Sequence, residues 1–339
     1  APGQPPARGD ATAAWLDHQC RTFGADPGNA WALAHAVEAY GPSFKAADGR
    51  PAIDVMVGDY LEKRGDGWGF PESKGGVPVE PHRNHQTSTL VVAGVPLDRA
   101  FTVRAAGGDK VTLETLVRQL APRASPADPE LLRHDAWTVQ ALAHLASKPA
   151  GKAAPQGLDL PAVMDRAVAF VDAQQQFLDE ARAQGAPSVP KRKQFIWSLP
   201  CGGFHHIQAA WAWDDAAFRK KHQKALDTLV RVMLYRLDAE TRVYDEALAQ
   251  APQYRLQLLV QKLKFYGHWL ETVAHFESDK LWPKSKETAA AKARARALLA
   301  DTVEALKGER LPERMGELKT AMPQLYLDLI GDSCHALTG

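Results

Sequence analysis

The amino-acid sequence predicts an all-α fold, and three observations support this prediction. Apolar residues recur at helical spacing, Gly and Pro stand where such runs end, and almost no stretch alternates as a half-buried strand does. Broadly apolar helices near residues 31, 85, 134, 206, 268 and 322 also alternate with charged, amphipathic ones. Helical hairpins stacked in this way form either a closed α/α toroid or an open α-solenoid, and buried inner helices favour the toroid.

In the first half of the chain, each helix is predicted from an apolar stripe and a stop signal. Residues 11–23 are weakly amphipathic, 31–40 have a broad apolar face that ends at Gly41-Pro42, and 51–61 open at Pro51. The Gly-rich residues 64–84 predict a long irregular connection, which suggests a use for it. Residues 85–93 are β-branched enough to fit a strand, but helix is favoured, and 112–120 and 128–147 follow as helices.

In the second half, a linker rich in Pro, Gly and Ala at 148–157 precedes a surface helix at 161–184. Pro200, Gly202 and Gly203 then break the backbone before a helix that starts at His205, and 214–237 form another helix. Residues 254–276 are apolar on several sides, as an inner helix would be, whereas 287–306 suit an outer one. The last helix is expected at 311–330, where Gly331 ends it and leaves Cys334 and His335 in a frayed tail.

Composition excludes several classes of function. The 339 residues are 45% apolar, which is ample for a substantial core. Lys and Arg number 41 against 40 Asp and Glu, so no excess of positive charge exists to neutralise a nucleic acid, and we expect no nucleic-acid partner. No apolar run approaches the roughly 20 residues of a transmembrane helix. The P-loop and Gly-x-Ser-x-Gly motifs are absent, so nucleotide hydrolysis and serine esterase chemistry lack support.

The two ends of the chain bear on localisation. Residues 1–10 are Pro-rich and begin without Met, like a processed, flexible leader, so we expect export from a bacterial cytoplasm and a single domain at 11–339. The three cysteines permit one disulfide and a free thiol, or three thiols. In an exported protein, Cys334 would pair with Cys20.

Several fragments resemble one superfamily. The Gly-rich segments Cys201-Gly-Gly-Phe-His205 and Gly65-Asp-Gly-Trp-Gly-Phe70 are similar to those of α/α toroids, which include terpenoid cyclases, protein prenyltransferases and polysaccharide lyases. Arg83-Asn-His-Gln-Thr87 resembles the Asn-His-x-Thr core of alginate-lyase-like toroids, and Cys334-His335 resembles the zinc site of lanthipeptide cyclases. No Asp-x-Asp-Asp motif occurs, which argues against terpene chemistry.

The favoured hypothesis is a metal-free polysaccharide lyase, which works by proton abstraction and elimination in a cavity lined by His and Trp. The resemblance implies that Asn84 polarises a uronate carboxylate, that Arg83 holds its charge, and that His85, His206 or Tyr266 exchanges the proton. Stacking on sugar rings is assigned to four tryptophans, namely Trp68, Trp137, Trp211 and Trp269. Tryptophans at helical spacing are also ordinary core residues, and Asn84 is a favoured helix N-cap.

The second hypothesis places zinc or copper in the same cavity, because imidazoles recur near the starts of the inner helices. The candidate ligands are His134, His205, His206, His268 and Cys201. His205 and His206 point about 100° apart on a helix, so at most one easily faces the cavity. For a single histidine, a helix cap or a hydrogen-bonded core residue is the more ordinary role. A third hypothesis is a non-catalytic helical module that binds a glycan, peptide or lipid.

Overall fold

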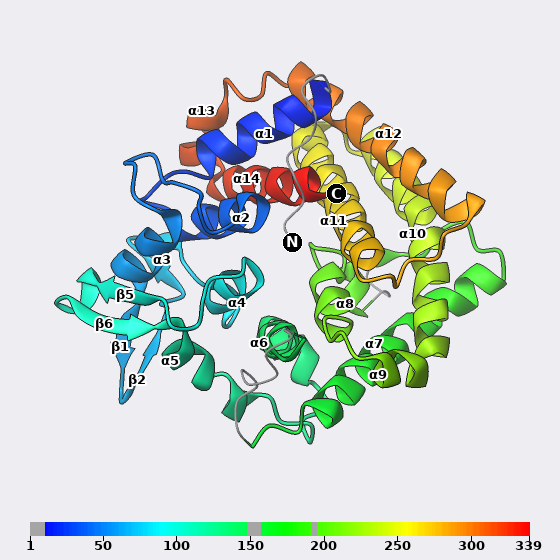
Figure 1. The fold of residues 1–339 in the computed structure, drawn as a ribbon. Helices are drawn as coiled ribbons and strands as arrows, with labels where there is room; N and C mark the ends of the chain where they lie inside the picture. Colours follow the sequence, from blue (N-terminus) through cyan, green and yellow to red (C-terminus); the bar gives the residue numbers. More distant parts are fainter. Residues whose placement is uncertain (1–10, 148–156, 192–194) are drawn as a thin grey trace. The chain divides into compact units, whose positions relative to one another are not determined.

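The computed structural model describes residues 11–147, 157–191 and 195–339, and these are mostly helical, with irregular connections and three two-stranded antiparallel hairpins (Figure 1). The all-α prediction is therefore confirmed. The expected leader at 1–10 and nearly all of the expected linker at 148–157 lie outside the described residues. None of the helices in the described ranges has both the length and the apolar content needed to cross a membrane.

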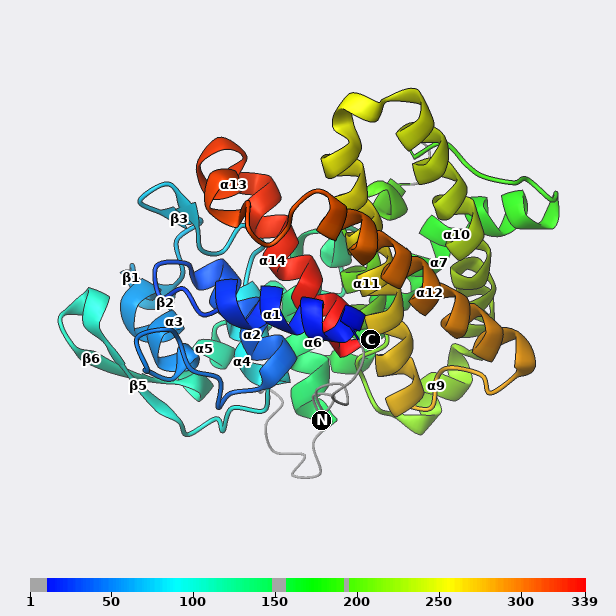
Figure 2. The same cartoon turned by 90° about the horizontal axis from the view of Figure 1, so that it is seen from above.

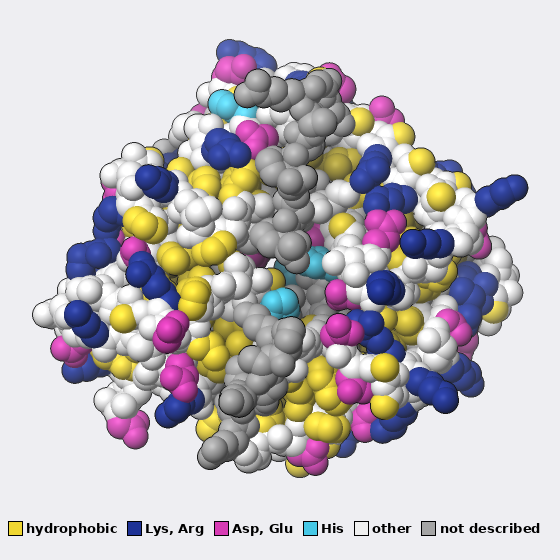
Figure 3. Space-filling view, in the orientation of Figure 1, with side chains coloured by type: hydrophobic (Ala, Val, Ile, Leu, Met, Phe, Trp, Pro, Cys, Tyr) yellow, Lys and Arg dark blue, Asp and Glu magenta, His cyan; other side chains and the backbone are white. Residues whose placement is uncertain are grey.

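The described residues group into two compact units. Unit 1 comprises residues 20–147, 157–167 and 209–215, and unit 2 comprises residues 11–19, 168–191, 195–208 and 216–339. Helix α1 (Ala11–Phe23) has the bounds that the sequence predicts, and it begins in unit 2. On the face that Figure 3 draws, basic and acidic side chains are interspersed, as the balanced composition leads one to expect.

Unit 1 is built on a set of packed helices: α2 (Ala30–Tyr40), α3 (Ala52–Tyr60), α4 (His85–Val92), α5 (Leu113–Arg118) and α6 (Leu131–Ala146). Helix α2 packs against both α3 and α4, and α4 packs against α6. The preference for helix over strand at 85–93 is confirmed. Helix α6 is interrupted at Asp135, whose φ and ψ of −129° and 33° are not helical.

The hairpins of unit 1 were not predicted from the sequence. They are β1 (Glu62–Arg64) with β2 (Gly67–Gly69), β3 (Ser73–Lys74) with β4 (Val77–Pro78), and β5 (Ala100–Val103) with β6 (Asp109–Thr112). Phe101 and Val103 are buried and alternate with exposed residues, and β5 packs against α3. Strands of two to four residues carry too little alternation to be recognised before pairing is known.

Unit 2 is centred on the inner helix α11 (Arg255–Ser278), whose residues are buried on several sides, as predicted. The other helices are α7 (Leu160–Ala183), which begins in unit 1, α8 (Phe204–Ala210), α9 (Ala216–Lys221), α10 (Gln223–Gln250), α12 (Lys286–Gly308), α13 (Met315–Ala321) and α14 (Pro323–Thr338). Helix α11 packs against α10, α12 and α14. Figures 1 and 2 show α12 and α14 on either side of it.

Two expected boundaries in unit 2 are wrong. The helix expected at 214–237 is two helices, since α9 ends before His222 and α10 continues to Gln250. The helix expected at 311–330 is also two, because Pro323 starts α14 afresh. Helix α14 then runs through Gly331 to Thr338, so the frayed-tail interpretation of Cys334 and His335 is wrong. Packing along α11 offsets the low helix propensity of a single glycine.

Candidate metal centre

Three histidines of unit 2 come together although they lie far apart in sequence. His205 is in α8, His268 in α11 and His335 in α14, and one ring nitrogen of each lies within 4.8 Å of the other two. The ring centroids of His268 and His335 are 4.1 Å apart, and His205 lies 4.7 and 5.3 Å from these two rings. His268 and His335 are buried and His205 is half-buried, so one side of this histidine trio is open to solvent.

The chain before α8 is bent so that His205 falls in the first turn of the helix. Gly202 and Gly203 have φ values of 62° and 77°, which only glycine adopts freely. A Cβ on Gly203 would lie 3.0 Å from the carbonyl oxygen of Ile196. The buried guanidinium of Arg236 donates to the carbonyl oxygens of Gly202 at 3.0 Å and Trp197 at 3.4 Å. These contacts fix the turn that delivers His205.

A second glycine allows α11 and α14 to approach closely beside the trio. Gly267 lies in the middle of α11, and a Cβ there would be 3.0 Å from the Cβ of Ala336 and 3.1 Å from its backbone nitrogen. The absence of a side chain therefore lets the two helices cross one residue away from both His268 and His335. Gly267 therefore serves the packing of α11 against α14.

One carboxylate joins two of the three imidazoles. Glu271 Oε1 lies 2.9 Å from Nδ1 of His335, and Oε2 lies 3.4 Å from Nδ1 of His268. Thr338 Oγ1 donates to Oε1 at 3.2 Å, and the side-chain amide of Gln208 donates to Oε2 at 3.2 Å. When Nδ1–H donates to a carboxylate, the lone pair of the ring is on Nε2, where it can bind a metal.

The protonation states of Glu271 and His268 suit metal binding. Burial alone would raise the pKa of Glu271, but the charge of His335 and the hydrogen bonds from His268 and His335 hold that pKa well below its usual range. Burial, and then the neighbouring His335, lower the pKa of His268 to about 4. At neutral pH Glu271 is thus ionised and His268 is a neutral imidazole, which is the form that ligates.

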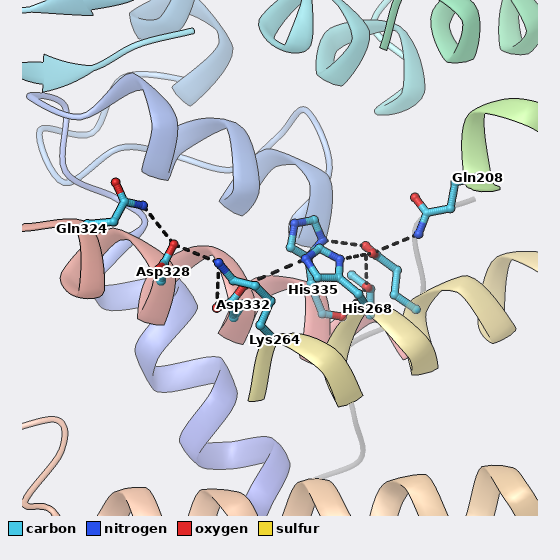
Figure 4. Close-up of polar contacts among 9 residues, drawn as sticks. Gln208, Lys264, His268, Gln324, Asp328, Asp332 and His335 are labelled. Atoms are coloured by element: carbon cyan, nitrogen blue, oxygen red, sulfur yellow. Dashed lines mark hydrogen bonds and ion pairs between the residues drawn. The ribbon is translucent and has the colours of Figure 1, made fainter. Parts of the chain in front are cut away.

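A line of charged groups leads from the trio along α11 and α14 (Figure 4). Asp332 Oδ1 lies 3.9 Å from His268 Nε2, Asp332 Oδ2 lies 3.8 Å from Lys264 Nζ, and Lys264 Nζ lies 3.0 Å from Asp328 Oδ1. Burial raises the pKa of Asp332 to about 8, against the opposite effect of Lys264. Burial would lower the pKa of Lys264, but Asp332 and Asp328 together raise it.

The structure brings together only some of the ligands that the sequence suggests. His205 and His268 are in the trio, whereas His206, the neighbour of His205, is buried outside it. His134 lies on α6 of unit 1 and is exposed, whereas its neighbour Asp135 is buried. Cys201 is a half-buried free thiol in the turn before α8, and burial raises its pKa, which disfavours the thiolate that a metal needs.

Sequence reasoning does not find Glu271 and Asp332. It notes that Cys334-His335 resembles a zinc site, but Gly331 has the signature of a helix stop, which places His335 in a tail and leaves it out of the candidate ligands. The usable signal was spacing, since Asp332 and His335 stand three residues apart, as do His268 and Glu271, and such pairs share a helix face.

The residues of the lyase hypothesis lie partly in unit 1. Asn84 has a left-handed φ of 63°, and its amide donates to Thr138 Oγ1 at 2.8 Å instead of capping α4. Arg83 is exposed and forms an ion pair with Asp135 at 3.3 Å. Trp137 is buried and stacks on His82, with ring centroids 4.5 Å apart. These side chains have partners within the protein.

The other residues of that hypothesis are mostly core. Tyr266 is buried in unit 2 with its hydroxyl 2.9 Å from Thr241 Oγ1, and burial raises its pKa to about 12. Trp269 is buried and donates to the carbonyl oxygen of Met233 at 3.0 Å, and Trp211 is buried in unit 1. Trp68 lines a small pocket of about 30 Å³, which has room for water but not for a sugar ring.

The remaining cysteines are accounted for. Cys20 and Cys334 are disulfide-bonded, and Cys201 is a free thiol.

Comparisons with family models, with curated proteins and with solved structures found no match to this chain. The chemistry of the residues therefore carries the functional argument.

Proposed function

We propose that the protein binds one divalent transition metal ion, either zinc or copper, through His205, His268 and His335. Three imidazoles form a donor set that suits zinc, copper, nickel and iron, and three protein nitrogens are enough for a stable zinc site. The observation that carries the proposal is the shared carboxylate of Glu271, which orients two of the ligands.

The geometry needs only a small closure to hold the ion. Zinc–nitrogen bonds of about 2.0–2.1 Å place tetrahedral ligands about 3.4 Å apart. The largest separation within the trio is at most 4.8 Å, so the rings move inward by roughly 1 Å. His205 is half-buried in a short helix, whereas His268 and His335 are buried in long ones, so His205 makes the larger movement.

Charge balance supports a cation at this place. The described contacts of the Glu271 carboxylate are two imidazoles, an amide and a hydroxyl, and no Lys or Arg is among them. A buried carboxylate is costly unless positive charge compensates it. A divalent cation on the Nε2 atoms of His268 and His335, in place of the proton that gives His335 its charge, would polarise both Nδ1–H groups towards Glu271 and supply the compensating charge.

The test is a competitive zinc titration of the chelator-treated full chain. We expect one zinc per chain, and affinity more than about 100-fold weaker in His268→Ala and His335→Ala, since each loses a ligand. His275→Ala is the matched control, because His275 is exposed on α11. If the chain takes up neither zinc nor copper, or if the two variants match the control, the proposal is wrong.

A second candidate function rests on unit 1. Glu38 Oε1 lies 3.3 Å from Nε2 of His85 and accepts from Thr89 Oγ1 at 2.6 Å. His85 Nδ1 is buried, and no hydrogen-bond partner for it exists within the described ranges. The rings of Trp31 and Trp137 lie 5.1 and 5.8 Å from the His85 ring. A carboxylate on one nitrogen and an unused second nitrogen suit a general base.

This arrangement supports the lyase hypothesis with His85 as the base and a uronate polysaccharide as substrate. The test is a screen of such polysaccharides for the ultraviolet absorbance of an unsaturated product. We expect His85→Ala to abolish activity and His134→Ala, at an exposed position of the same unit, to retain it. A wild-type chain that releases no such product would remove this candidate.

Two broader expectations from the sequence also enter the proposal. The disulfide-bonded Cys20 and Cys334 support export, because disulfides persist in oxidising compartments. The alternation of inner and outer helices supports a toroid as the arrangement of the helices.

A further inference from the structure

We propose that Asp332 is the fourth ligand of the metal, so that the site is a three-histidine, one-aspartate centre. This inference rests on the proposed metal function and specifies its coordination. It turns a site with an open position into a closed one, which is the arrangement of structural rather than catalytic zinc.

Helices α8, α11 and α14 share one arrangement of side chains around the histidine trio. Each places one polar side chain three residues from its histidine, namely Gln208 beside His205, Glu271 beside His268, and Asp332 beside His335. Residues at this spacing share a helix face, so all three polar groups are directed to the same region as the imidazoles. Pairs of an acid and a histidine at this spacing are a known way for helices to present metal ligands.

Of these three polar side chains, Asp332 alone has a buried atom without a hydrogen-bond partner among the described residues. Gln208 donates to Glu271 Oε2 at 3.2 Å and to Thr272 Oγ1 at 3.0 Å. Glu271 accepts from both histidines. Asp332 is 3% exposed, and its Oδ2 has no hydrogen-bond partner among the residues that the structure describes. A buried carboxylate with no hydrogen bond to one of its oxygens is costly, and a metal bound to the other oxygen, Oδ1, would lower that cost by neutralising the charge of the group.

The distances place Asp332 on the correct side of His268. Its Oδ1 lies 3.9 Å from Nε2, the nitrogen that remains for a metal once Nδ1 faces Glu271. A metal about 2.0–2.2 Å from the oxygen and about 2.0–2.1 Å from the nitrogen sets these atoms roughly 3.4 Å apart. Asp332 Oδ2 faces Lys264 at 3.8 Å, so Lys264 can hold the second oxygen while Oδ1 binds.

The charges of the completed site sum to zero. The divalent cation balances the carboxylates of Asp332 and Glu271, and Lys264 is paired with Asp328 at 3.0 Å. Neutrality matters because the carboxylates of Asp332 and Glu271 are buried. A hard oxygen donor also disfavours copper(I) and favours zinc among the ions that imidazole accepts.

The test replaces zinc by cobalt(II) in the full chain and records the d–d absorption spectrum, which reports the coordination. We expect the intense spectrum of a four-coordinate ion. Asp332→Asn should weaken cobalt and zinc binding at least about tenfold and change the spectrum, because the ion loses its oxygen ligand. Asp328→Asn is the control. Asp328 lies on α14, as Asp332 does, and also pairs with Lys264, so this change removes one negative charge beside Lys264 without removing a ligand.

Each outcome supports or overturns one claim. If Asp332→Asn binds cobalt with wild-type affinity and spectrum, Asp332 is not a ligand and the three-histidine site stands. If the wild-type chain binds neither ion, the proposed function itself fails. X-ray absorption on the zinc-loaded wild-type chain requires no variant: the inference requires three imidazoles and one oxygen, and three imidazoles with two or more oxygens contradict it.

Discussion

At the scale of single residues, Glu271 decides how the histidine trio works. It contacts two ligands of one site, so its loss changes both at once. We predict that Glu271→Gln weakens zinc binding about 10- to 100-fold, because an amide can accept from only one Nδ1–H and presents N–H groups to the other ring.

Competitive zinc titration measures this effect. Glu277→Gln, an exposed change on the same helix, serves as the control and should leave the affinity unchanged. Equal affinities in the two variants would mean that Glu271 does not orient the ligands.

Glu80 of unit 1 gives a prediction that is independent of metal. It is half-buried, its Oε1 accepts from the backbone nitrogen of Gln86 at 3.0 Å, and burial raises its pKa from 4.5 to about 7. Between these two values the folded chain retains a proton that the unfolded chain has lost. The contribution of Glu80 to stability is therefore complete below pH 4.5, falls as the pH rises to 7, and stays lost above it.

Glu80→Gln removes this dependence and keeps the accepting oxygen. We expect the variant to gain on the order of 2 kcal/mol relative to wild type between pH 4.5 and pH 8. Urea unfolding of both proteins at several pH values measures the difference. A gap that does not change with pH would contradict the assignment.

At the scale of elements, the crossing of α11 and α14 positions His268 and His335. Gly267→Ala places a Cβ 3.0 Å from the Cβ of Ala336, and this overpacking should cost about 1–3 kcal/mol. It should also weaken zinc binding, because the two helices that carry these ligands move apart.

Gly308→Ala is the matched control, since it lies at the end of α12 and nothing approaches its Cβ position within 4 Å. Denaturant unfolding and zinc titration of the two variants provide the comparison. If both alanines behave alike, close helix contact does not set the site.

The element scale also shows why sequence reasoning succeeded in part. The inner character of 254–276 was predictable because apolar residues surround the whole helix, which only burial tolerates. The end of α14 was not, because Gly331 has the signature of a stop and only its packing on α11 keeps the helix going. That one error removed His335 from the candidate ligands, while His205 and His268 could be found.

At the scale of the whole molecule, the state of the cysteines tests the link to an oxidising compartment. With Cys20 and Cys334 bonded, thiol titration of the unfolded, unreduced chain should find one thiol, and prior reduction should raise the number to three. The single reactive thiol should disappear in Cys201→Ser. Three thiols without reduction would contradict the bonded state and weaken the case for export.

Anomalous diffraction from crystals of the zinc-soaked full chain, recorded at the zinc edge, tests the central claim most directly. The account predicts one strong peak about 2.0–2.1 Å from a ring nitrogen of each of His205, His268 and His335, and about 2.0–2.2 Å from Asp332. A peak with the three histidines but away from Asp332 would leave a metal site with an open position. No peak at the histidine trio, with zinc bound elsewhere or not at all, would contradict the account.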